Sequence, residues 1–365
     1  MSDSARNEVD PDRLKMFSFL VFSKLEGAVT SGMIHLGDRL GLYRILADAT
    51  DSLSDDELAG RARLHPRWVR EWIRNQAAAR IIDVEFVDGV ELYGLSPEAR
   101  VVLADESHPA FGMGMFHRLP QTMNALEYLP DSFRTGLGRD YDSHGPDGAV
   151  GIERSFEPWS RSYLLPVVLP ALDGMVDRLE RGAAVADIGC GAGGAAIRMA
   201  TAFPRSSVVG YDISMHALDR ANERRSSEAV GNVEFRDPRR DPLPEDGSLD
   251  LVTAFDCIHD MTHPQDVMNS IRRSLRPDGT WLLVDIKALD TFEETMRKNP
   301  MASLMYGISV MSCMSSAMSL PGGAGLGTLG LPESKARAMA AEAGFTRFRR
   351  LDVEHSLNAF YEIKP

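Results

Sequence analysis

The stretch Val185-Ala-Asp-Ile-Gly-Cys-Gly-Ala-Gly-Gly194 decides the fold of this 365-residue chain. It has the pattern of a short buried strand, a glycine-rich turn and the first residues of a helix. Gly189, Gly191 and Gly194 satisfy G-x-G-x-x-G, with which a parallel α/β sheet brings backbone close to a nucleotide-like ligand. The glycines alone do not distinguish one such ligand from another.

From Ala183 onward, short apolar runs alternate with helical patterns. The runs are AAVADIG (183–189), SVVGYDI (207–213), NVEFRD (232–237), LDLVTAF (249–255) and TWLLVDI (280–286). This rhythm is typical of βαβ units and predicts a Rossmann-like parallel sheet. A helix over residues 332–343 and a last pair of strands complete the predicted α/β domain.

Three aspartates follow the predicted strands and select the ligand. Asp187 lies two residues before Gly189, where a carboxylate repels the pyrophosphate of a dinucleotide but attracts the ammonium and sulfonium of S-adenosylmethionine (SAM). Asp212 ends the next strand and is placed to accept hydrogen bonds from ribose hydroxyls. Asp237 ends the third strand and is placed to accept from the adenine amino group. Each aspartate alone could instead be a helix N-cap; their order and spacing together favour SAM.

The runs DIGCGAGG, YDIS, VEFRD, FDCIHD and LRPDGTWLLVDI resemble a class I SAM-dependent methyltransferase with a seven-stranded sheet, over residues 183–290. The whole chain is similar to bacterial methyltransferases that carry a winged helix, which are related to winged-helix O-methyltransferases. The resemblance implies SAM as cofactor and a small-molecule methyl acceptor, and leaves the acceptor unnamed. The predicted cofactor-binding residues are Asp187, Gly189, Cys190, Gly191, Asp212 and Asp237, to which the resemblance adds Ile213, Phe255 and Tyr141. Packing is the alternative role for Tyr141.

The N-terminal part predicts an α-rich winged-helix domain. Helical patterns from Leu14 onward indicate one or two buried helices, helix-turn-helix spacing follows, and Asp88-Gly89 between two alternating runs indicates a hairpin. We therefore expect a flexible tail (1–13), a winged-helix and dimerisation domain (14–110), a helical linker and substrate lid (111–175) and a SAM-binding methyltransferase domain (176–365).

His259 and Asp260 are the predicted catalytic residues. They follow the fourth strand, at the carboxyl edge where open α/β sheets bind ligands, and the pair resembles the strand-end motif of winged-helix O-methyltransferases, in which the histidine deprotonates a hydroxyl. Met261 replaces that family's tryptophan. The competing interpretation is that Asp256 caps the next helix and His259 packs on its first turn.

Three further features are weaker candidates. Glu354-His355 is expected in a strand near the C-terminal end. A place at a solvated edge or a lid contact is a better explanation of this pair than catalysis. The glycine-rich run PGGAGLGTLG (321–330) could be a flap that excludes water. Six methionines between residues 296 and 318 could line an apolar or aromatic acceptor, although core packing explains most of them. They are Met296, Met301, Met305, Met311, Met314 and Met318.

Composition narrows the function classes. A net charge of −13 disfavours a polyanionic partner such as DNA. Cys190, Cys257 and Cys313 have no paired spacing, so we expect no disulfide framework and a cytoplasmic protein. No metal is expected, on the argument that no carboxylate cluster remains once the three aspartates bind SAM. The N-terminal residues have no apolar export signal, and no apolar run of membrane-spanning length is present.

Three functions compete on this sequence. A small-molecule methyltransferase, O- or N-directed, is favoured. A SAM-responsive, DNA-binding transcriptional regulator is the alternative, because six arginines (61, 63, 67, 70, 74 and 80) gather in the helix-turn-helix, although the hairpin after it is acidic. A dehydrogenase would instead bind NAD at the glycine loop. The apolar first helix, with Phe17, Leu20, Val21, Phe22 and Leu25, predicts a homodimer.

Overall fold

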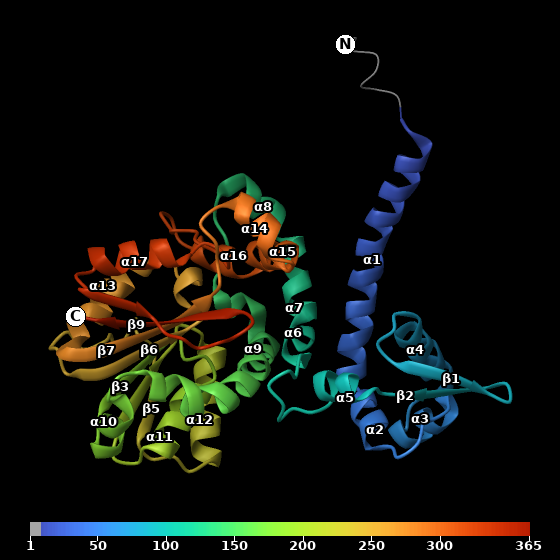
Figure 1. Ribbon diagram of the computed structural model, residues 1–365, viewed down its shortest axis with the longest axis horizontal. Helices are drawn as coiled ribbons and strands as arrows, with labels where there is room; N and C mark the ends of the chain where they lie inside the picture. The colour runs from blue at the N-terminus through green and yellow to red at the C-terminus, as the bar shows by residue number, and fades with distance from the viewer. Residues whose placement is uncertain (1–8) are drawn as a thin grey trace, which may run out of the picture. The chain divides into compact units, whose positions relative to one another are not determined.

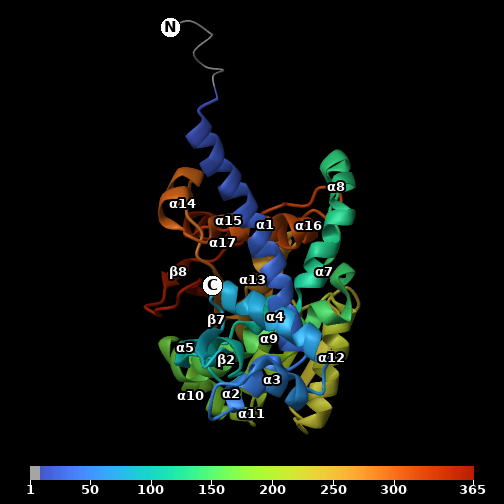
Figure 2. The same ribbon diagram turned by 90° about the vertical axis from the view of Figure 1, so that its right-hand side faces the viewer.

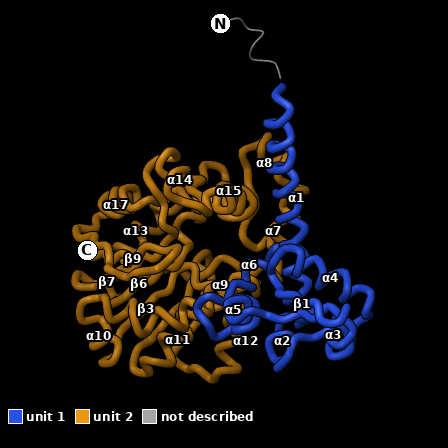
Figure 3. Tube along the Cα trace, turned by 45° about the vertical axis from the view of Figure 1, so that its right-hand side comes forward, with its two compact units in different colours: residues 1–119 blue, residues 120–365 orange. Residues whose placement is uncertain are grey.

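The computed structural model describes residues 9–365 (Figure 1). The chain forms two compact units, one ending at Leu119 and the other starting at Pro120 (Figure 3). Of the predicted tail, residues 1–8 lie outside the described residues, and the first helix already begins at Pro11. Within residues 9–365, no helix is long and apolar enough to cross a membrane.

The first unit is a winged helix, as predicted. Ser54 and Glu57 form a reciprocal capping box at the start of its third helix. Asp88 and Gly89 both adopt positive φ, 51° and 81°, as a two-residue type I′ hairpin requires. The elements are α1 (Pro11–Arg39), α2 (Leu42–Asp48), α3 (Asp55–Ala62), α4 (Pro66–Ala78), β1 (Asp83–Val87), β2 (Val90–Gly94), α5 (Pro97–Leu103) and α6 (Met113–His117).

Helix α1 departs from the prediction that the apolar N-terminal residues are buried. It is one helix, and only its C-terminal part, from Thr30 on, contains buried residues within this unit. The large apolar side chains of its first half are all more than half exposed; they are Leu14, Met16, Phe17, Phe19, Leu20, Val21, Phe22, Leu25 and Val29. This half of α1 has no protein surface in its own unit to pack against.

The second unit contains the predicted seven-stranded Rossmann-like sheet. Its strand order is β5-β4-β3-β6-β7-β9-β8. The pairs from β5 through β7 are parallel, whereas β9 is antiparallel to both β7 and β8. The strands are β3 (Ala184–Ile188), β4 (Ser207–Tyr211), β5 (Val233–Arg236), β6 (Leu249–Phe255), β7 (Leu275–Ile286), β8 (Arg347–Arg350) and β9 (Asn358–Lys364).

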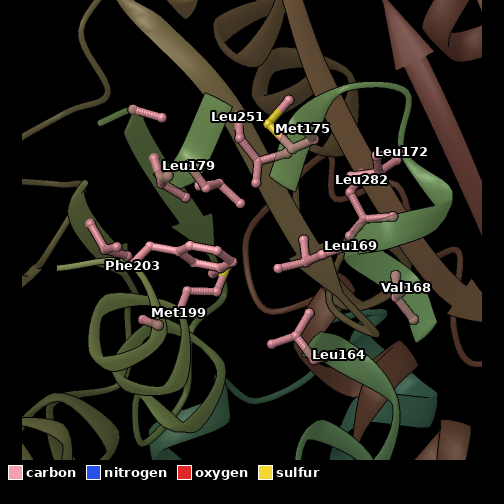
Figure 4. Close-up of a cluster of buried hydrophobic side chains, with 14 of the residues drawn as sticks. Leu164, Val168, Leu169, Leu172, Met175, Leu179, Met199, Phe203, Leu251 and Leu282 are labelled. Carbon is pink, nitrogen blue, oxygen red and sulfur yellow. The ribbon is translucent and has the colours of Figure 1, made fainter. Parts of the chain in front are cut away.

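Both faces of the sheet are buried, because alternate residues of each strand enter different cores. Leu251 and Leu282 pack with Leu179 and Met199 in one core (Figure 4). Val252 and Leu283 belong to the other core, with residues of α13 and α17. The helices that follow or flank the strands are α10 (Met175–Arg181), α11 (Gly194–Ala202), α12 (Met215–Ser227), α13 (Pro264–Ser274) and α17 (Glu333–Glu342).

Short helices precede and interrupt the α/β domain. Before the sheet lie α7 (Leu119–Asn124), η2 (Ala125–Glu127), α8 (Leu129–Thr135), η3 (Tyr141–His144), α9 (Gly145–Trp159), η4 (Ser160–Val168) and η5 (Leu169–Ala171). After β7 come α14 (Phe292–Lys298), α15 (Ala302–Met311) and α16 (Cys313–Ala317), which lie together in both ribbon views (Figures 1 and 2). The expectation that His355 lies in a strand is wrong, since residues 351–357 form the loop between β8 and β9.

The strand order places a ligand site beside β3. Strand β3 pairs with β4 on one side and with β6 on the other. The strands that follow β3 in sequence are therefore added first on one side of it and then on the other. In an open α/β sheet this switch point leaves a crevice beyond the carboxyl ends of the strands. The loop after β3 and the segment after β6 therefore meet at one edge of the sheet.

Candidate functional site

The glycine loop after β3 has a left-handed backbone conformation that residues other than glycine rarely adopt. Gly189, Gly191 and Gly193 have φ values of 64°, 54° and 76°. A Cβ at Gly189 would lie 2.6 Å from Cys257 Cβ, and one at Gly193 would lie 2.4 Å from the Phe235 ring. A Cβ at Gly191 would meet nothing within 4 Å. The loop is thus packed against protein at two glycines and faces open space at Gly191.

Asp187 is a buried carboxyl group with one unused oxygen. Its residue is 1% exposed, and its Oδ1 accepts a 2.6 Å hydrogen bond from Thr253 Oγ1. Its Oδ2 has no hydrogen-bond partner among the described residues. Burial raises the pKa of Asp187 to about 7, well above its ordinary value. The hydrogen bond from Thr253 lowers this pKa, and the charge of Asp212 raises it further.

Asp212 connects the glycine loop to β4. Its Oδ2 accepts from Gly191 N at 2.8 Å and its Oδ1 accepts from Ser214 N at 2.8 Å. Burial raises the pKa of Asp212, although the backbone hydrogen bonds oppose the shift. Beside it, Cys190 N donates to Tyr211 O at 3.0 Å, and burial raises the pKa of the Cys190 thiol. Asp212 therefore fixes the position of Gly191, the glycine that faces open space.

Asp237, Ile213 and Phe255 also lie at the carboxyl ends of their strands, but they differ in exposure and in the partners that they contact. Asp237 is already paired with Arg239, whose Nε donates to Oδ1 at 2.8 Å and whose Nη2 donates to Oδ2 at 3.0 Å. The same Nη2 donates to the carbonyl oxygen of Ile213, whose side chain is exposed. Phe255 packs against Trp159, with ring centroids 5.2 Å apart.

Tyr141 lies in η3, ahead of the sheet. Its ring meets that of His144 edge-on at 5.7 Å. The next residue, Asp142, accepts from Met215 N at 3.2 Å, which links η3 to the start of α12 just after Asp212 and Ile213. The sequence did not identify Asp142, and no strand-end or motif signal marks it.

These residues fit SAM on the observations of the loop itself. A cationic ligand would satisfy the unpartnered Asp187 Oδ2, and the open space at Gly191 admits a ligand close to the backbone. An anionic pyrophosphate would instead lie beside the carboxyl groups of Asp187 and Asp212. The chemistry of this loop suits a methyl donor with a positive charge better than a dinucleotide.

His259 is buried beside a second carboxylate that the sequence did not identify. It lies in η6 (Ile258–Asp260), is 2% exposed, and its Nδ1 is 2.6 Å from Oδ1 of Asp285 at the end of β7. Burial lowers the pKa of His259, but the charge and hydrogen bond of Asp285 outweigh it and hold this pKa well above its ordinary value. Since Nδ1 donates to Asp285, Nε2 is the nitrogen left to accept a proton.

One expectation about this segment is wrong, and the premise of another does not hold. Asp256 does not cap the next helix, because α13 begins only at Pro264 and Asp256 accepts from Asn358 Nδ2. Asp256 also has a positive φ of 48°. The premise of the argument against a metal does not hold, because the half-buried Asp256 and the buried Asp285 are carboxyl groups at strand ends in addition to the three assigned to SAM. Burial and the charge of Asp285 raise the pKa of Asp256.

The glycine-rich run 321–330 lies over the His259 segment. Gly327 N donates to His259 O at 3.0 Å, and Ala324 N donates to Thr262 O at 2.9 Å. The preceding helix α16 packs on η6, and a ligand atom of its Cys313 lies within 4.8 Å of one of His259. The predicted methionine wall is only partly present, since Met296 and Met301 are 62% and 44% exposed.

A small pocket of about 20 Å³, with room for about one water molecule, is lined by residues of the segments 121–144 and 311–315. Arg139, whose guanidinium lies 4.1 Å above the Tyr128 ring, lines it. Its lining also includes Gln121, Asn124, Ser132, Ser143, His144, Met311 and Ser315. Polar side chains outnumber apolar ones in this pocket, and its volume is too small for a methyl acceptor.

Comparison with known families identifies both parts of the chain. Residues 179–344 match a family described as a methyltransferase domain. Residues 28–104 match a family described as an Rv2258c-like winged HTH domain. These ranges contain the glycine loop, His259 and the winged helix of the first unit.

Relatives in sequence and structure include several methyltransferases. The chain is 39% identical over 110 residues, 29% of its length, to the 27-O-demethylrifamycin SV methyltransferase of Amycolatopsis mediterranei, and this match spans 40% of that enzyme. It is 28% identical over 141 residues, 38% of its length, to the ubiquinone biosynthesis O-methyltransferase of Neisseria meningitidis, and spans 54% of it. The chain thus spans about half of these curated relatives or less.

Solved structures resemble the fold over nearly the whole chain. Human N-acetylserotonin methyltransferase in complex with SAM matches with a TM-score of 0.69 and 17% identity, covering 100% of this chain and 99% of that one. An O-methyltransferase family protein from Burkholderia thailandensis matches with a TM-score of 0.63 and 15% identity, covering 98% of both chains. At these identities the likeness establishes the fold.

Proposed function

Because the chain carries a methyltransferase domain behind a winged helix-turn-helix domain, we propose that it transfers a methyl group from SAM to a hydroxyl group of a small-molecule acceptor. The observation that carries the proposal is the buried Asp187 oxygen without a partner, beside a glycine loop that leaves open space at Gly191. The O-methyltransferases among the relatives support the choice of oxygen over nitrogen.

We assign the residues around β3 and β4 to the donor. Asp187 Oδ2 would pair with a positive group of SAM, and Gly189, Cys190 and Gly191 would approach it through their backbone. Asp212 would hold the loop and meet the ribose, with Ile213, Asp237, Phe255 and Tyr141 around the rest of the molecule. When bound, SAM supplies an electrophilic methyl group, so the protein's task is to position an acceptor oxygen in line with it.

We assign His259 to the acceptor. Its Nε2 would take the proton of the acceptor hydroxyl as the oxygen attacks the methyl carbon, and the positive charge that results on the ring would be stabilised by Asp285. Asp285 is then a positioning residue, because it fixes the ring orientation and the tautomer through Nδ1. Asp260, the other predicted catalytic residue, lies next to His259 on the same turn.

The roles of the domains are proposals that follow the prediction from the sequence. We propose residues 14–110 for dimerisation, 111–175 as a helical linker and substrate lid, and 176–365 for SAM binding, in a cytoplasmic protein.

Calorimetry with SAM tests the proposed function. We expect SAM to bind and NAD to leave the heat signal unchanged. Because SAM prefers the charged form of Asp187, and the pKa of this group is about 7 without ligand, binding at lower pH must release a proton. The affinity for SAM should therefore be about tenfold weaker at pH 6 than at pH 8. The pKa of Asp187 in the folded protein exceeds its ordinary value of 3.8, so this carboxyl group lowers the stability of the fold as pH rises from about 4 to about 7.

Asp187→Asn is the control for this titration. It should bind SAM more weakly and lose most of the pH dependence, because the amide cannot ionise. If NAD binds in preference to SAM, the proposed function is wrong. If SAM binds equally well at pH 6 and pH 8, Asp187 does not pair with its positive charge.

We also propose that the exposed half of α1 pairs with a second copy of the chain. Light scattering at micromolar concentration should give a dimer, and Phe19→Ser with Phe22→Ser should shift it to a monomer, because these rings are 79% and 68% exposed in the single chain. Lys24→Ser on the same helix serves as the control and should remain dimeric. A monomeric wild-type protein at this concentration would refute the pairing.

The alternative, a SAM-responsive DNA-binding regulator, is not favoured. Three of the six arginines that suggested it pair with acidic side chains of their own unit: Arg67 with Glu71, Arg70 with Asp55, and Arg74 with Glu91. The wing carries four acidic residues and no basic one between residues 83 and 91. Phosphate contacts need unpaired positive charge on this face.

A further inference from the structure

The segment after β6 and helix α16 bring three different metal-ligand atoms together. One ligand atom each from His259, Asp260 and Cys313 lies within 4.8 Å of the other two. We propose that these three residues form a binding site for a thiophilic divalent metal ion such as Zn²⁺. The site is separate from the residues that we assign to SAM, and it goes beyond methyl transfer.

The orientation of His259 favours coordination through Nε2. Its Nδ1 is held by Asp285 at 2.6 Å, so the lone pair on the other ring nitrogen is the one that faces a ligand. Metal-binding histidines commonly donate their second ring N–H to a carboxylate in this way, which fixes the ring and raises its basicity. Asp285 is only 2% exposed, and its Oδ2 has no partner among residues 9–365. The outer carboxylate of a metal site is therefore already in place.

The ligand set is selective for its metal. A nitrogen, a carboxylate oxygen and a cysteine sulfur suit Zn²⁺, which binds three protein ligands and one further ligand in open tetrahedral sites. Mg²⁺ and Ca²⁺ prefer oxygen ligands throughout, so the thiol disfavours them. As thiolate and carboxylate, Cys313 and Asp260 would together balance the charge of a divalent ion.

The fold holds the ligands together without a metal. Helix α16 packs on η6, which already places the Cys313 thiol within 4.8 Å of a ligand atom of His259. The backbone on both sides is tied, because Gly327 N donates to His259 O at 3.0 Å and Ser316 N donates to Ser312 O at 2.8 Å. Little rearrangement is needed before an ion binds, so little ordering entropy opposes binding.

Occupancy of this site has a defined chemical consequence. A metal ion on Nε2 uses the lone pair that would otherwise accept the proton of the acceptor hydroxyl. Metal binding and base catalysis at His259 are therefore mutually exclusive, and Zn²⁺ inhibits the methyl transfer proposed above.

Cobalt is the spectroscopic probe for the site, and zinc is the probe for affinity. The full-length protein, stripped with EDTA and reduced, should bind one equivalent of Co²⁺ and show the thiolate-to-cobalt charge-transfer band in the near ultraviolet. Cys313→Ser should lose this band and bind Zn²⁺ at least tenfold more weakly in competition with a chromogenic chelator. Cys257→Ser is the matched control and should keep the band, because Cys257 donates to Ile188 O at 3.1 Å and lies outside the ligand set.

A second variant and a second measurement keep the test decisive. Asp285→Asn should lower Zn²⁺ affinity by roughly 10- to 100-fold, because the carboxylate that orients the histidine ligand is lost. This variant retains Cys313, so it tests the site even if Cys313→Ser does not fold. Absence of stoichiometric metal binding, or a charge-transfer band that survives in Cys313→Ser, overturns the metal site. S-adenosylhomocysteine calorimetry on the same samples reports separately on the proposed function, whose donor residues these variants leave intact.

Discussion

Replacing His259 with glutamine should lower turnover by about 10²- to 10⁴-fold, the usual contribution of a general base. The variant retains a polar side chain of similar size but cannot accept the proton of the acceptor. The measurement is transfer of label from methyl-tritiated SAM to hydroxyl-bearing small molecules that the wild-type protein methylates. Affinity for S-adenosylhomocysteine should stay within about twofold, because His259 is not among the donor contacts.

A neighbouring histidine provides the control for this prediction. His263 lies four residues further along, is exposed, and makes no side-chain cap at the start of α13. His263→Gln should therefore leave turnover unchanged. Normal turnover in His259→Gln would remove this residue from the mechanism and leave positioning as the main contribution of the protein.

Replacing Asp212 with alanine should weaken SAM binding by about 100-fold or more, equivalent to about 2.7 kcal/mol. The structure explains why the loss is large. The carboxylate accepts from both Gly191 N and Ser214 N at 2.8 Å, and hydrogen bonds to a charged group contribute about 1.5–3 kcal/mol each. The variant loses the ribose contact and the hydrogen bond that places Gly191.

Graded variants separate these two effects of Asp212. Asp212→Asn keeps an oxygen that can accept one backbone N–H, so calorimetry should give an affinity between those of wild type and Asp212→Ala. Asp219→Ala, an exposed position on α12, is the matched control and should bind normally. Unchanged affinity in a folded Asp212→Ala protein would contradict the assignment of Asp212 to the donor.

The sequence was sufficient for the architecture because local patterns and strand order agree. Each of the five apolar runs became a strand, and Asp88-Gly89 became the hairpin turn. Along β6 and the second half of β7, residues of both faces are buried and mostly apolar, which is typical of strands covered by helices on both faces. These features are encoded by neighbours in sequence.

The site was only partly predictable because its remaining groups come from distant segments. Asp285 ends the strand TWLLVDI and could have been found by the reasoning that identified Asp212. Thr253 lies inside a strand, and Cys313 reaches His259 from a helix more than 50 residues later. No spacing in the sequence predicts such contacts, since they arise when strands pair and α16 packs on η6.

The exposed first half of α1 was also misjudged for a physical reason. An apolar helical pattern indicates that a surface will be covered, but it does not say whether the same chain covers it. The pattern predicted burial within the unit, and the structure leaves Phe19 and Phe22 exposed in the single chain. The prediction of a dimer depends on the same residues.

The unpartnered oxygen of Asp187 suits the binding of the donor but lowers the stability of the unliganded protein. A buried polar group without a hydrogen bond costs about 1–3 kcal/mol, a sizeable part of the 5–15 kcal/mol that typically holds a folded domain together. A bound methyl donor that supplies the missing partner returns this energy, so the unliganded protein should melt at a lower temperature than the liganded one. An apolar residue at position 187 could make a hardier protein, but one without the charge that selects the donor.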